Sequence, residues 1–198
     1  MKIILRDIGT SIIATIVFAV VVCGVYPFVV WGIAQLAFPF QANGSLVMSS
    51  SGQIVGSRLM GQLVSTSSPQ YFQPRPSAAG SGYDPTLSGG TNLGPTSKKL
   101  TDEIAANVAA YRKENGLSAT TSVPADAVTS SASGLDPDIS IQNAMLQAPR
   151  VAKARHMDLS QVVTLVDKNI DPRGLGFLGE PGVNVLMLNI ALDAAQGR

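Results

Sequence analysis

Cysteine and histidine are almost missing from this sequence, which has one of each in 198 residues. Cys23 lies inside a long apolar run, so the rest of the chain can form no internal disulfide and no thiolate metal site. A Ser/His/Asp triad needs a base beside the serine, and a zinc site needs several histidine or cysteine ligands. His156 follows basic residues at an expected helix end, where histidines commonly meet terminal carbonyls. We therefore predict no triad and no metal site.

A basic excess is also missing. From Pro39 to the end, the chain has 12 lysine and arginine residues and 12 acidic residues. Proteins that bind nucleic acids usually carry a clear surplus of positive charge. Nucleic acid is therefore not an expected partner.

Residues 8–38 contain no charged side chain. A bilayer core about 30 Å thick needs roughly 20 apolar residues in helical form, and a lone span must be helical to satisfy its own backbone. We predict one transmembrane helix over 8–38, bent near Pro27, which lacks one backbone donor. A cleaved signal peptide is the alternative, but its apolar region is only about 7–15 residues long.

The orientation of this span follows from its flanking charges. Lys2 and Arg6 precede it, whereas the next basic residue after it is Arg58. The positive-inside rule then places residues 1–7 in the cytoplasm and residues 39–198 outside it. We expect a single-pass protein of the inner (plasma) membrane with one periplasmic or otherwise extracytoplasmic domain.

Small residues recur along the span at Gly9, Ala14, Ala19 and Gly24. Small side chains allow close helix–helix approach in lipid. We predict a partner-facing surface here, centred on Ala19 and Gly24.

The extracytoplasmic part is long enough for one α+β domain. Two short apolar runs, residues 45–48 and 54–60, flank Ser49–Gly52 and predict a β-hairpin. Residues 65–94 are rich in Ser, Pro and Gly but contain spaced aromatic residues, so we expect an ordered loop. Tyr71, Phe72 and Arg75 in this loop are candidate partner contacts.

Several helices should follow the loop. Pro95–Asn115 has an apolar stripe and ends before Gly116. Ser140 should cap a helix that Pro149 interrupts, giving a second helix from Pro149 to Arg155. Asp158 and Gln161 predict a capping box for a helix ending near Asn169. We favour helix for Val183–Ala195, with a strand through Val183, Val185 and Met187 as the alternative.

One Gly-rich stretch could contact a nucleotide. Leu87–Gly90 matches the start of the LSGGQ signature of ABC-type ATPases, with Thr91 replacing glutamine, and it precedes a predicted helix. Ser88, Gly89 and Gly90 are therefore nucleotide candidates, but we prefer a tight turn, and no directly bound cofactor is expected. Pro95 stands where a Walker A loop has lysine. Asp136 and Asp138 could ligate a hard cation, although a turn before a helix cap is the simpler interpretation.

A set of segments recurs along the whole chain in a fixed order that is more specific than any single motif. The segments include Tyr26-Pro27, Ala42–Leu46, Tyr71-Phe72, Arg75–Ala78, Ser88–Ser97, Val123–Asp126, Ser133–Pro137, Arg150–Arg155 and Asn184–Leu186. In these segments the chain resembles the C subunit of the Kdp-type potassium-transporting P-type ATPase. Departures are small and include Thr91, where serine is common.

This resemblance implies an accessory subunit with no catalytic site of its own. Its implied partners are a potassium-channel-like subunit, a phosphorylated pump subunit and a small peptide subunit, besides membrane lipid. Two roles are implied for the family: a cap or stabiliser at the outer potassium entrance, and a catalytic chaperone that raises the pump subunit's affinity for ATP. With the domain outside, ATP would act only through the complex. The alternatives are an anchored cell-envelope hydrolase, with a serine near Lys98, Lys99 or Lys153, and a ligand-binding module.

Overall fold

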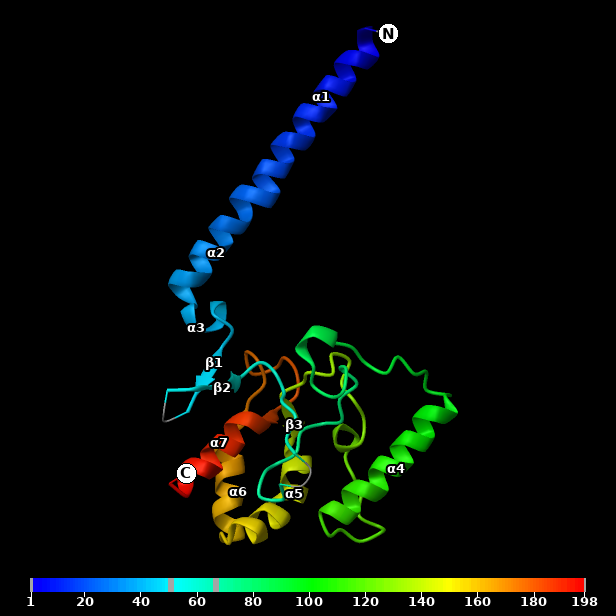
Figure 1. Cartoon of the computed structure of the whole chain (residues 1–198), viewed down its shortest axis with the longest axis vertical. Helices are drawn as coiled ribbons and strands as arrows, with labels where there is room; N and C mark the ends of the chain where they lie inside the picture. Colours follow the sequence, from blue (N-terminus) through cyan, green and yellow to red (C-terminus); the bar gives the residue numbers. More distant parts are fainter. Residues whose placement is uncertain (1, 50–51, 66–67, 198) are drawn as a thin grey trace. The chain divides into compact units, whose positions relative to one another are not determined.

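The computed structural model describes residues 2–49, 52–65 and 68–197. The chain divides into two compact units, Met1–Leu46 and Val47–Arg198. Each unit is described separately, and Figure 1 labels their helices and strands.

The first unit is dominated by one long helix. α1 (Lys2–Phe18) runs into a π-helical segment, η1 (Ala19–Val25), and then into α2 (Tyr26–Ala37). Together these elements give an uninterrupted helix over Ile3–Ala37 that is long and apolar enough to cross a membrane. The predicted single span is confirmed. A single helical turn, α3 (Pro39–Ala42), follows it.

Pro27 does not end this helix. Just before it, the N–H of Tyr26 donates to the carbonyl of Val21, five residues back, instead of the usual four. Such wider π-helical turns occur as local irregularities within α-helices. The donor that proline lacks is accommodated by a change of hydrogen-bond pattern in the preceding turns.

The second unit begins with the predicted hairpin. β1 (Leu46–Met48) and β2 (Ile54–Ser57) form a two-stranded sheet. Ser50 and Ser51, in the middle of the expected turn, lie outside the described residues. The second strand ends at Ser57, whereas the apolar run predicted from the sequence continued to Met60. The chain turns after Ser57, and the N–H of Met60 donates to the carbonyl of Ser57.

A second, antiparallel sheet was not predicted. Its order is β3 (Asp138–Ser140), β5 (Gly182–Asn184) and β4 (Ile170–Asp171). Val183 pairs with Ile139 on one side and with Ile170 on the other. Strands of two or three residues are too short to show an alternating pattern in the sequence.

α4 (Lys98–Glu114) is the predicted long soluble helix. It starts three residues after Pro95 because the Ser97 side chain accepts from the N–H of Leu100 and caps the first turn. Gly116 has a φ of 64° just beyond the end. This left-handed position suits glycine and confirms the predicted stop.

α5 (Ile141–Arg155) is one helix, so the prediction of two helices separated at Pro149 is wrong. Ser140 caps the N-terminus as expected, accepting from the N–H of Asn143. The helix continues through Pro149 because its apolar face stays in register with the core on both sides of the proline. Ala144, Ala148, Val151 and Ala152 are all buried there. Packing of this face outweighs the single missing hydrogen bond.

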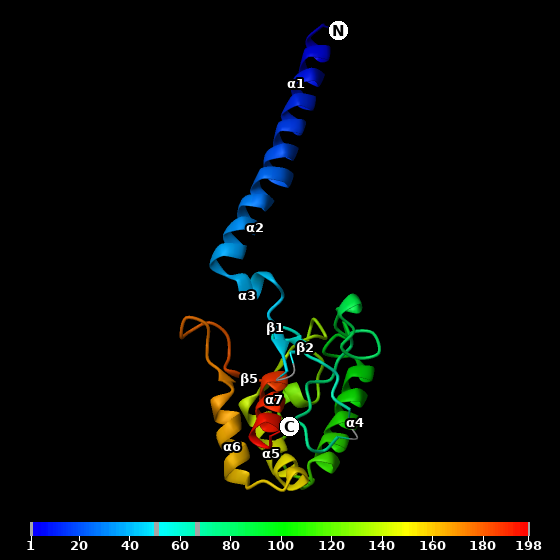
Figure 2. The ribbon, with the colours of Figure 1, turned by 60° about the vertical axis from the view of Figure 1, so that its left-hand side comes forward.

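The last two helices agree closely with the sequence. α6 (Leu159–Lys168) has the capping box formed by Asp158 and Gln161, with Asn169 at its C-terminal end. α7 (Val185–Ala195) is capped by Asn184. The closing segment is helical from Val185, as favoured from the sequence, and of the alternative strand only Val183 lies in one, β5. Figure 2 shows α5 and α7 lying between α6 and α4.

The main core lies where α5, α6 and α7 meet the three-stranded sheet. A smaller cluster around Tyr111, Ala127 and Val128 connects α4 to the short 3-10 turn η3 (Ala125–Ala127). The described part of residues 65–94 is an ordered loop with one 3-10 turn, η2 (Pro85–Leu87), and Phe72 and Tyr83 are buried. The main core is formed by Phe72, Ile139, Ala144, Ala148, Val151, Ala152, Val162, Val166, Val183, Val185, Leu188 and Leu192.

Candidate functional site

The loop segment Pro69–Ser77 crosses the domain between the C-terminal helices and a surface cleft. It contains three of the partner contacts predicted from the sequence. Its backbone is held in place by side chains of α5 and α7, which determine which loop residues remain accessible.

Arg150, on α5, fixes the beginning of this segment. Its Nη1 donates to the carbonyl oxygens of Pro69 at 2.6 Å and Tyr71 at 3.0 Å. Its Nε donates to Asn115 Oδ1, and its Nη2 to Gln147 Oε1. Burial lowers the pKa of Arg150, an effect that Glu114 opposes. All three guanidinium nitrogens donate to groups inside the domain, so this arginine braces the loop.

Arg155, five residues later at the end of α5, holds the neighbouring residues. Its Nε donates to the carbonyl of Gln70 at 2.6 Å, and its Nη2 to Asp193 Oδ1 on α7 at 2.7 Å. The guanidinium also lies 4.8 Å from the centroid of the Tyr71 ring, within cation–π range. The Tyr71 hydroxyl donates to the other carboxylate oxygen of Asp193. The predicted contact residue Tyr71 is thus half-buried and already engaged.

Phe72 is a correction to the sequence-based prediction. Its ring has 0% exposure and belongs to the main core. Its N–H donates to Asn189 Oδ1, and its carbonyl accepts from Asn189 Nδ2. A side chain with no exposed surface cannot face a partner; its role is to anchor the loop.

Arg75 ties the segment to the loop before β3. Its Nη1 donates to Asp136 Oδ2 at 2.7 Å, and both side chains are partly exposed. Tyr83 donates its hydroxyl to the carbonyl of Arg75. The Nε of Arg75 is buried without a hydrogen-bond partner. Arg75 is therefore largely structural, with a partly accessible surface.

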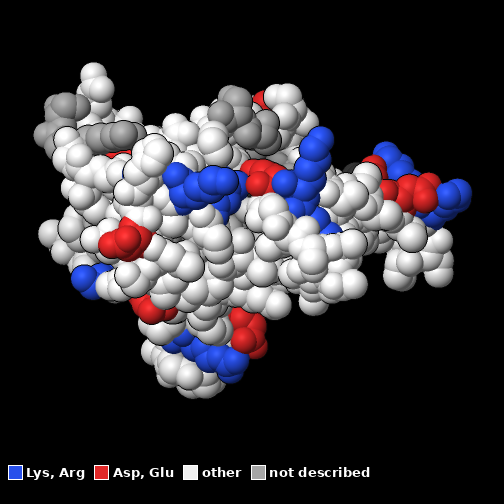
Figure 3. Space-filling model, turned by 90° about the horizontal axis from the view of Figure 1, so that it is seen from below, with Lys and Arg blue, Asp and Glu red and all other residues white. Residues whose placement is uncertain are grey.

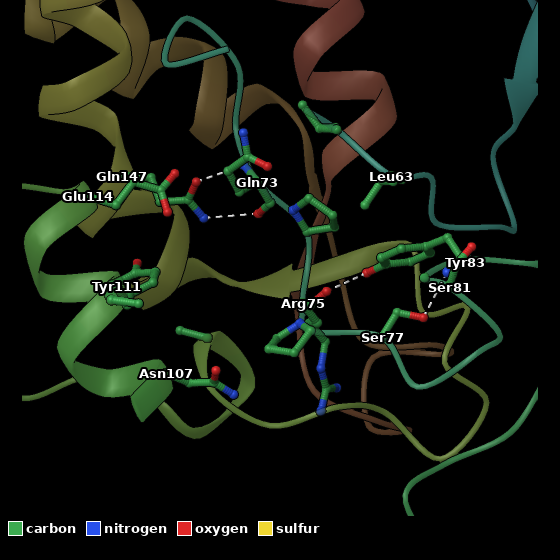
Figure 4. A pocket seen from close by; sticks show the side chains of 16 residues that line it. Leu63, Gln73, Arg75, Ser77, Ser81, Tyr83, Asn107, Tyr111, Glu114 and Gln147 are labelled. Atoms are coloured by element: carbon green, nitrogen blue, oxygen red, sulfur yellow. Dashed lines mark hydrogen bonds between the residues drawn. The ribbon is translucent and has the colours of Figure 1, made fainter. Parts of the chain in front are cut away.

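A cleft of about 350 Å³ lies between this segment and α4 (Figure 4). Gln73 forms one wall, with its backbone N–H donating to Gln147 Oε1 and its carbonyl accepting from Gln147 Nε2. Tyr83 and Tyr111 line the cleft, and burial raises the pKa of both phenols well above the ordinary value. The phenols therefore remain neutral hydrogen-bond donors.

Two serines are among the described residues that line the cleft, and the hydroxyl of one is engaged in hydrogen bonds within the domain. Ser77 Oγ donates to the carbonyl of Gly134 and accepts from the N–H groups of Ala79 and Tyr83. Ser81 is the other, and the described part of the lining contains no lysine and no histidine. Lys98 and Lys99, considered for a serine–lysine mechanism, form i,i+4 ion pairs on α4 with Asp102 and Glu103.

The Gly-rich stretch packs against another loop. Gly89 N–H and Ser88 Oγ both donate to the carbonyl of Ser133. A Cβ placed on Gly90 would lie 3.1 Å from the carbonyl oxygen of Ala132, a tight approach that favours glycine. These contacts explain the glycines by packing and leave the Gly89 donor satisfied. The nucleotide hypothesis for Ser88, Gly89 and Gly90 remains a prediction.

Asp136, just before β3, and Asp138, the first residue of β3, have separate structural roles. Asp136 Oδ1 accepts from the N–H of Asp138, which is the turn favoured by the sequence. Asp138 Oδ1 accepts from Asn184 Nδ2. Burial, with help from Asp136 and Asp171, raises the pKa of Asp138. Among the residues that the structure describes, no group of three or more His, Cys, Asp and Glu side chains is arranged to hold a metal.

His156 ends α5 in the left-handed conformation, with its N–H directed at the carbonyls of Ala152 and Lys153. This is the helix-end position predicted from the sequence.

Sequence reasoning missed the buried amides that organise this site. Asn143 and Gln147 on α5, together with Asn189 on α7, are almost fully buried. Asp126 also accepts from Ser140 Oγ and Asn143 Nδ2, fixing η3 against α5. The signal in the sequence that could have revealed them is a polar side chain on an otherwise apolar helix face. Such groups are hydrogen-bonded when buried, so they indicate a backbone segment crossing that face.

The four small residues of the span do not all lie on one face of the helix, as the prediction required. Gly9, Ala14 and Ala19 are spaced by five residues in or next to α-helix, so successive members lie about 140° apart around the axis. Ala19 and Gly24 are also five apart, but they lie within η1, whose hydrogen bonds join residues five apart. Only this pair is brought towards one face.

The face of the molecule in Figure 3 shows small groups of charged side chains of mixed sign, separated by wide uncharged areas. A molecule that binds this face would therefore contact mostly uncharged side chains.

Comparison with known families identifies the chain. The family model for KdpC, described as the K+-transporting ATPase c chain, matches residues 8–194. The chain belongs to the KdpC family. A Mycobacterium tuberculosis relative, a potassium-transporting ATPase KdpC subunit, is 53% identical over 188 residues, covering 95% of this chain and 98% of the relative. Proteins of the same name are 48% identical in Caulobacter vibrioides (96% and 94% covered) and 57% identical in Allorhizobium ampelinum (87% and 88% covered). The match includes both the span and the domain.

Proposed function

We propose that this chain is a non-catalytic accessory subunit of a high-affinity, ATP-driven potassium uptake complex. The observation that carries the proposal is the match to the KdpC family over residues 8–194, which includes the apolar helix as well as the domain. The relatives are named as subunits of a potassium-transporting ATPase, and their lengths agree with that of this chain. The proposed partners are a potassium-channel-like subunit, a P-type pump subunit and a small peptide subunit.

The side-chain chemistry supports a structural role. The arginines of α5 and the buried amides of α5 and α7 are directed at the loop 69–73 and hold it in one conformation. Ser77, which lines the cleft beside α4, uses its hydroxyl to support a turn. A domain built in this way presents a fixed surface, which suits an assembly partner.

We propose an orientation with the N-terminus in the cytoplasm and the domain outside. Lys2 and Arg6 before the span support it through the positive-inside rule. The outer domain would then stabilise the complex at the potassium entrance as a cap. Any effect on ATP affinity would be transmitted through the complex.

Affinity purification of the full-length chain from native membranes tests the assembly. We expect a polytopic pump subunit and a channel-like subunit to co-purify. Recovery of the chain alone from gently solubilised membranes would contradict the proposal.

Site-specific labelling tests the orientation. Cys23→Ala combined with Thr91→Cys gives a single thiol on an exposed loop of the domain. A membrane-impermeant maleimide should label it from outside in intact cells. Labelling only after the membrane is opened would overturn the orientation and the cap role, while leaving the assembly untouched.

A further inference from the structure

The loop between β4 and β5 exposes an unusual amount of apolar surface. Leu175, Phe177 and Leu178 are 85%, 70% and 53% exposed within five consecutive residues. Single exposed apolar side chains are ordinary, but a concentrated group of large ones indicates a contact with another surface. The core, the loop segment Pro69–Ser77 and the cleft do not account for these exposed apolar side chains.

The backbone at Leu175 strengthens this inference. Its φ is 52°, in the left-handed region that a leucine rarely adopts. Glycine would reach the same conformation without strain. Because the side chain is also almost fully exposed, packing within the domain does not account for a leucine here. Strained residues that persist without a packing role point to function.

The backbone of the loop tip is largely satisfied by the loop itself. Gly174 and Leu178 exchange two N–H to carbonyl hydrogen bonds, both 2.8 Å long. Gly176 N–H donates to the carbonyl of Arg173, and Phe177 N–H donates to that of Gly174. A segment that leaves water must satisfy its backbone groups internally. This tip meets most of that requirement before any contact is made.

The loop lies at the end of the domain where the chain enters. Figures 1 and 2 both show the loop before β5 near β1 and β2. Only residues 38–46 separate the span from Val47, a connection that reaches at most roughly 30 Å. That end of the domain therefore stays within reach of the bilayer surface.

Two features favour lipid over a protein surface as the occupant. Residues 174–178 are Gly-Leu-Gly-Phe-Leu and offer no polar side chain for the hydrogen bonds that protein interfaces usually carry. At the base of the loop, Arg173 pairs with Glu180 at 2.7 Å, and both remain exposed. An apolar tip above charged groups matches the order of layers at a membrane interface.

We propose that residues 174–178 form an apolar wedge that enters the headgroup and upper acyl region of the leaflet on the domain's side. The wedge would fix the orientation of the domain on the membrane, which the span alone does not do. This contact requires a bilayer and the full chain, and it does not depend on the identity of the partner subunits.

Photocrosslinking of the full-length chain in native membranes tests the wedge. The photoreactive amino acid p-benzoylphenylalanine replaces Phe177, an aromatic exchange at an exposed site that should leave the fold intact. The matched control carries the same group at Leu159, an exposed leucine (47%) that begins α6 at the other end of the domain. After irradiation, adducts are identified by mass spectrometry.

We expect phospholipid adducts at position 177 and several-fold fewer at position 159. Polypeptide adducts at position 177 would overturn the proposal in favour of a protein partner. Equal lipid adducts at both positions, or none at either, would overturn it as well. Co-purification of the partner subunits with the Phe177 variant is measured in the same membranes, so failure of the wedge and failure of the assembly can be told apart.

Discussion

Arg155 on α5 donates to Asp193 on α7 across 2.7 Å, and the arginine side chain is fully buried. The same two residues enclose Tyr71, whose ring lies under the guanidinium and whose hydroxyl bonds the carboxylate. This ion pair thus joins α5, α7 and the loop segment Pro69–Ser77. Three elements distant in the sequence depend on one charged contact.

Arg155→Met should therefore destabilise the domain strongly. The substitution keeps an apolar side chain of similar length but removes the donors that Arg155 supplies to Asp193 Oδ1 and to the carbonyl of Gln70. We expect a loss of about 2–3 kcal/mol in the free energy of unfolding, below the range for a fully buried pair because Asp193 keeps some solvent contact. Urea denaturation of the full-length chain in detergent, followed by circular dichroism, measures it.

The matched control is Lys98→Met, which removes an exposed i,i+4 pair with Asp102 on α4. Its effect should stay below about 0.5 kcal/mol. Equal losses in the two variants would contradict the bracing role of Arg155.

Phe72→Ala tests the assignment of this residue to the core. Loss of a fully buried aromatic ring should cost about 3–5 kcal/mol in the free energy of unfolding, through lost burial and the remaining cavity. Phe177→Ala removes the same side chain from an exposed site and should change that energy by no more than about 0.5 kcal/mol. If urea denaturation gave similar values for both, Phe72 would not be a core residue.

Asp138 should make stability depend on pH in a specific direction. Burial raises the pKa of its carboxyl above the unfolded value of 3.8, so its ionised form is disfavoured in the folded state. The penalty is absent below the unfolded pKa and develops as the pH rises through the folded pKa. Asp138→Asn, which keeps an acceptor for Asn184, should therefore gain stability relative to the parent as the pH rises from about 3 to 7.

Asp84→Asn is the control with the opposite sign. Hydrogen bonds from Thr86 lower the pKa of Asp84, so its ionised form supports the fold above the unfolded pKa. The variant should lose stability relative to the parent over the same rise in pH. Denaturation curves at several pH values measure both differences. A gain of stability in Asp84→Asn, or a loss in Asp138→Asn, would refute the assignment made for that residue.

The π-helical face of the span should contribute to assembly. Ala19→Leu and Gly24→Leu add bulk on the face that η1 creates, where close helix approach needs small side chains. Both should lower the yield of co-purified partner subunits. Val21→Leu and Val22→Leu add a methylene group elsewhere in η1 and should have smaller effects. Equal losses at all four positions would show that the helix anchors the domain without a specific face for partner subunits.

The sequence predicted those parts of the fold whose signal is local. Ser140, Asp158 and Gly116 each mark a helix boundary through their own hydrogen bonds or backbone conformation, and the structure places a boundary at each. The charge-free run predicted the span for the same reason.

The parts that failed depend on contacts distant in the sequence. Pro149 remains inside α5 because the core holds the helix on both sides of it. The three-stranded sheet depends on Val183 meeting Ile139 and Ile170, which no local pattern reveals. Phe72 looked like a surface aromatic within a polar loop, yet the amide of Asn189, over a hundred positions later, draws its backbone into the core.

Potassium uptake tests the central claim most directly. In a strain that lacks only this chain but keeps the other subunits, uptake at low external potassium should be lost and should return when the full-length chain is supplied. Residues 1–46, supplied without the domain, should not restore it. Unchanged uptake in the strain that lacks the chain would contradict its role as a subunit of the potassium-transporting ATPase.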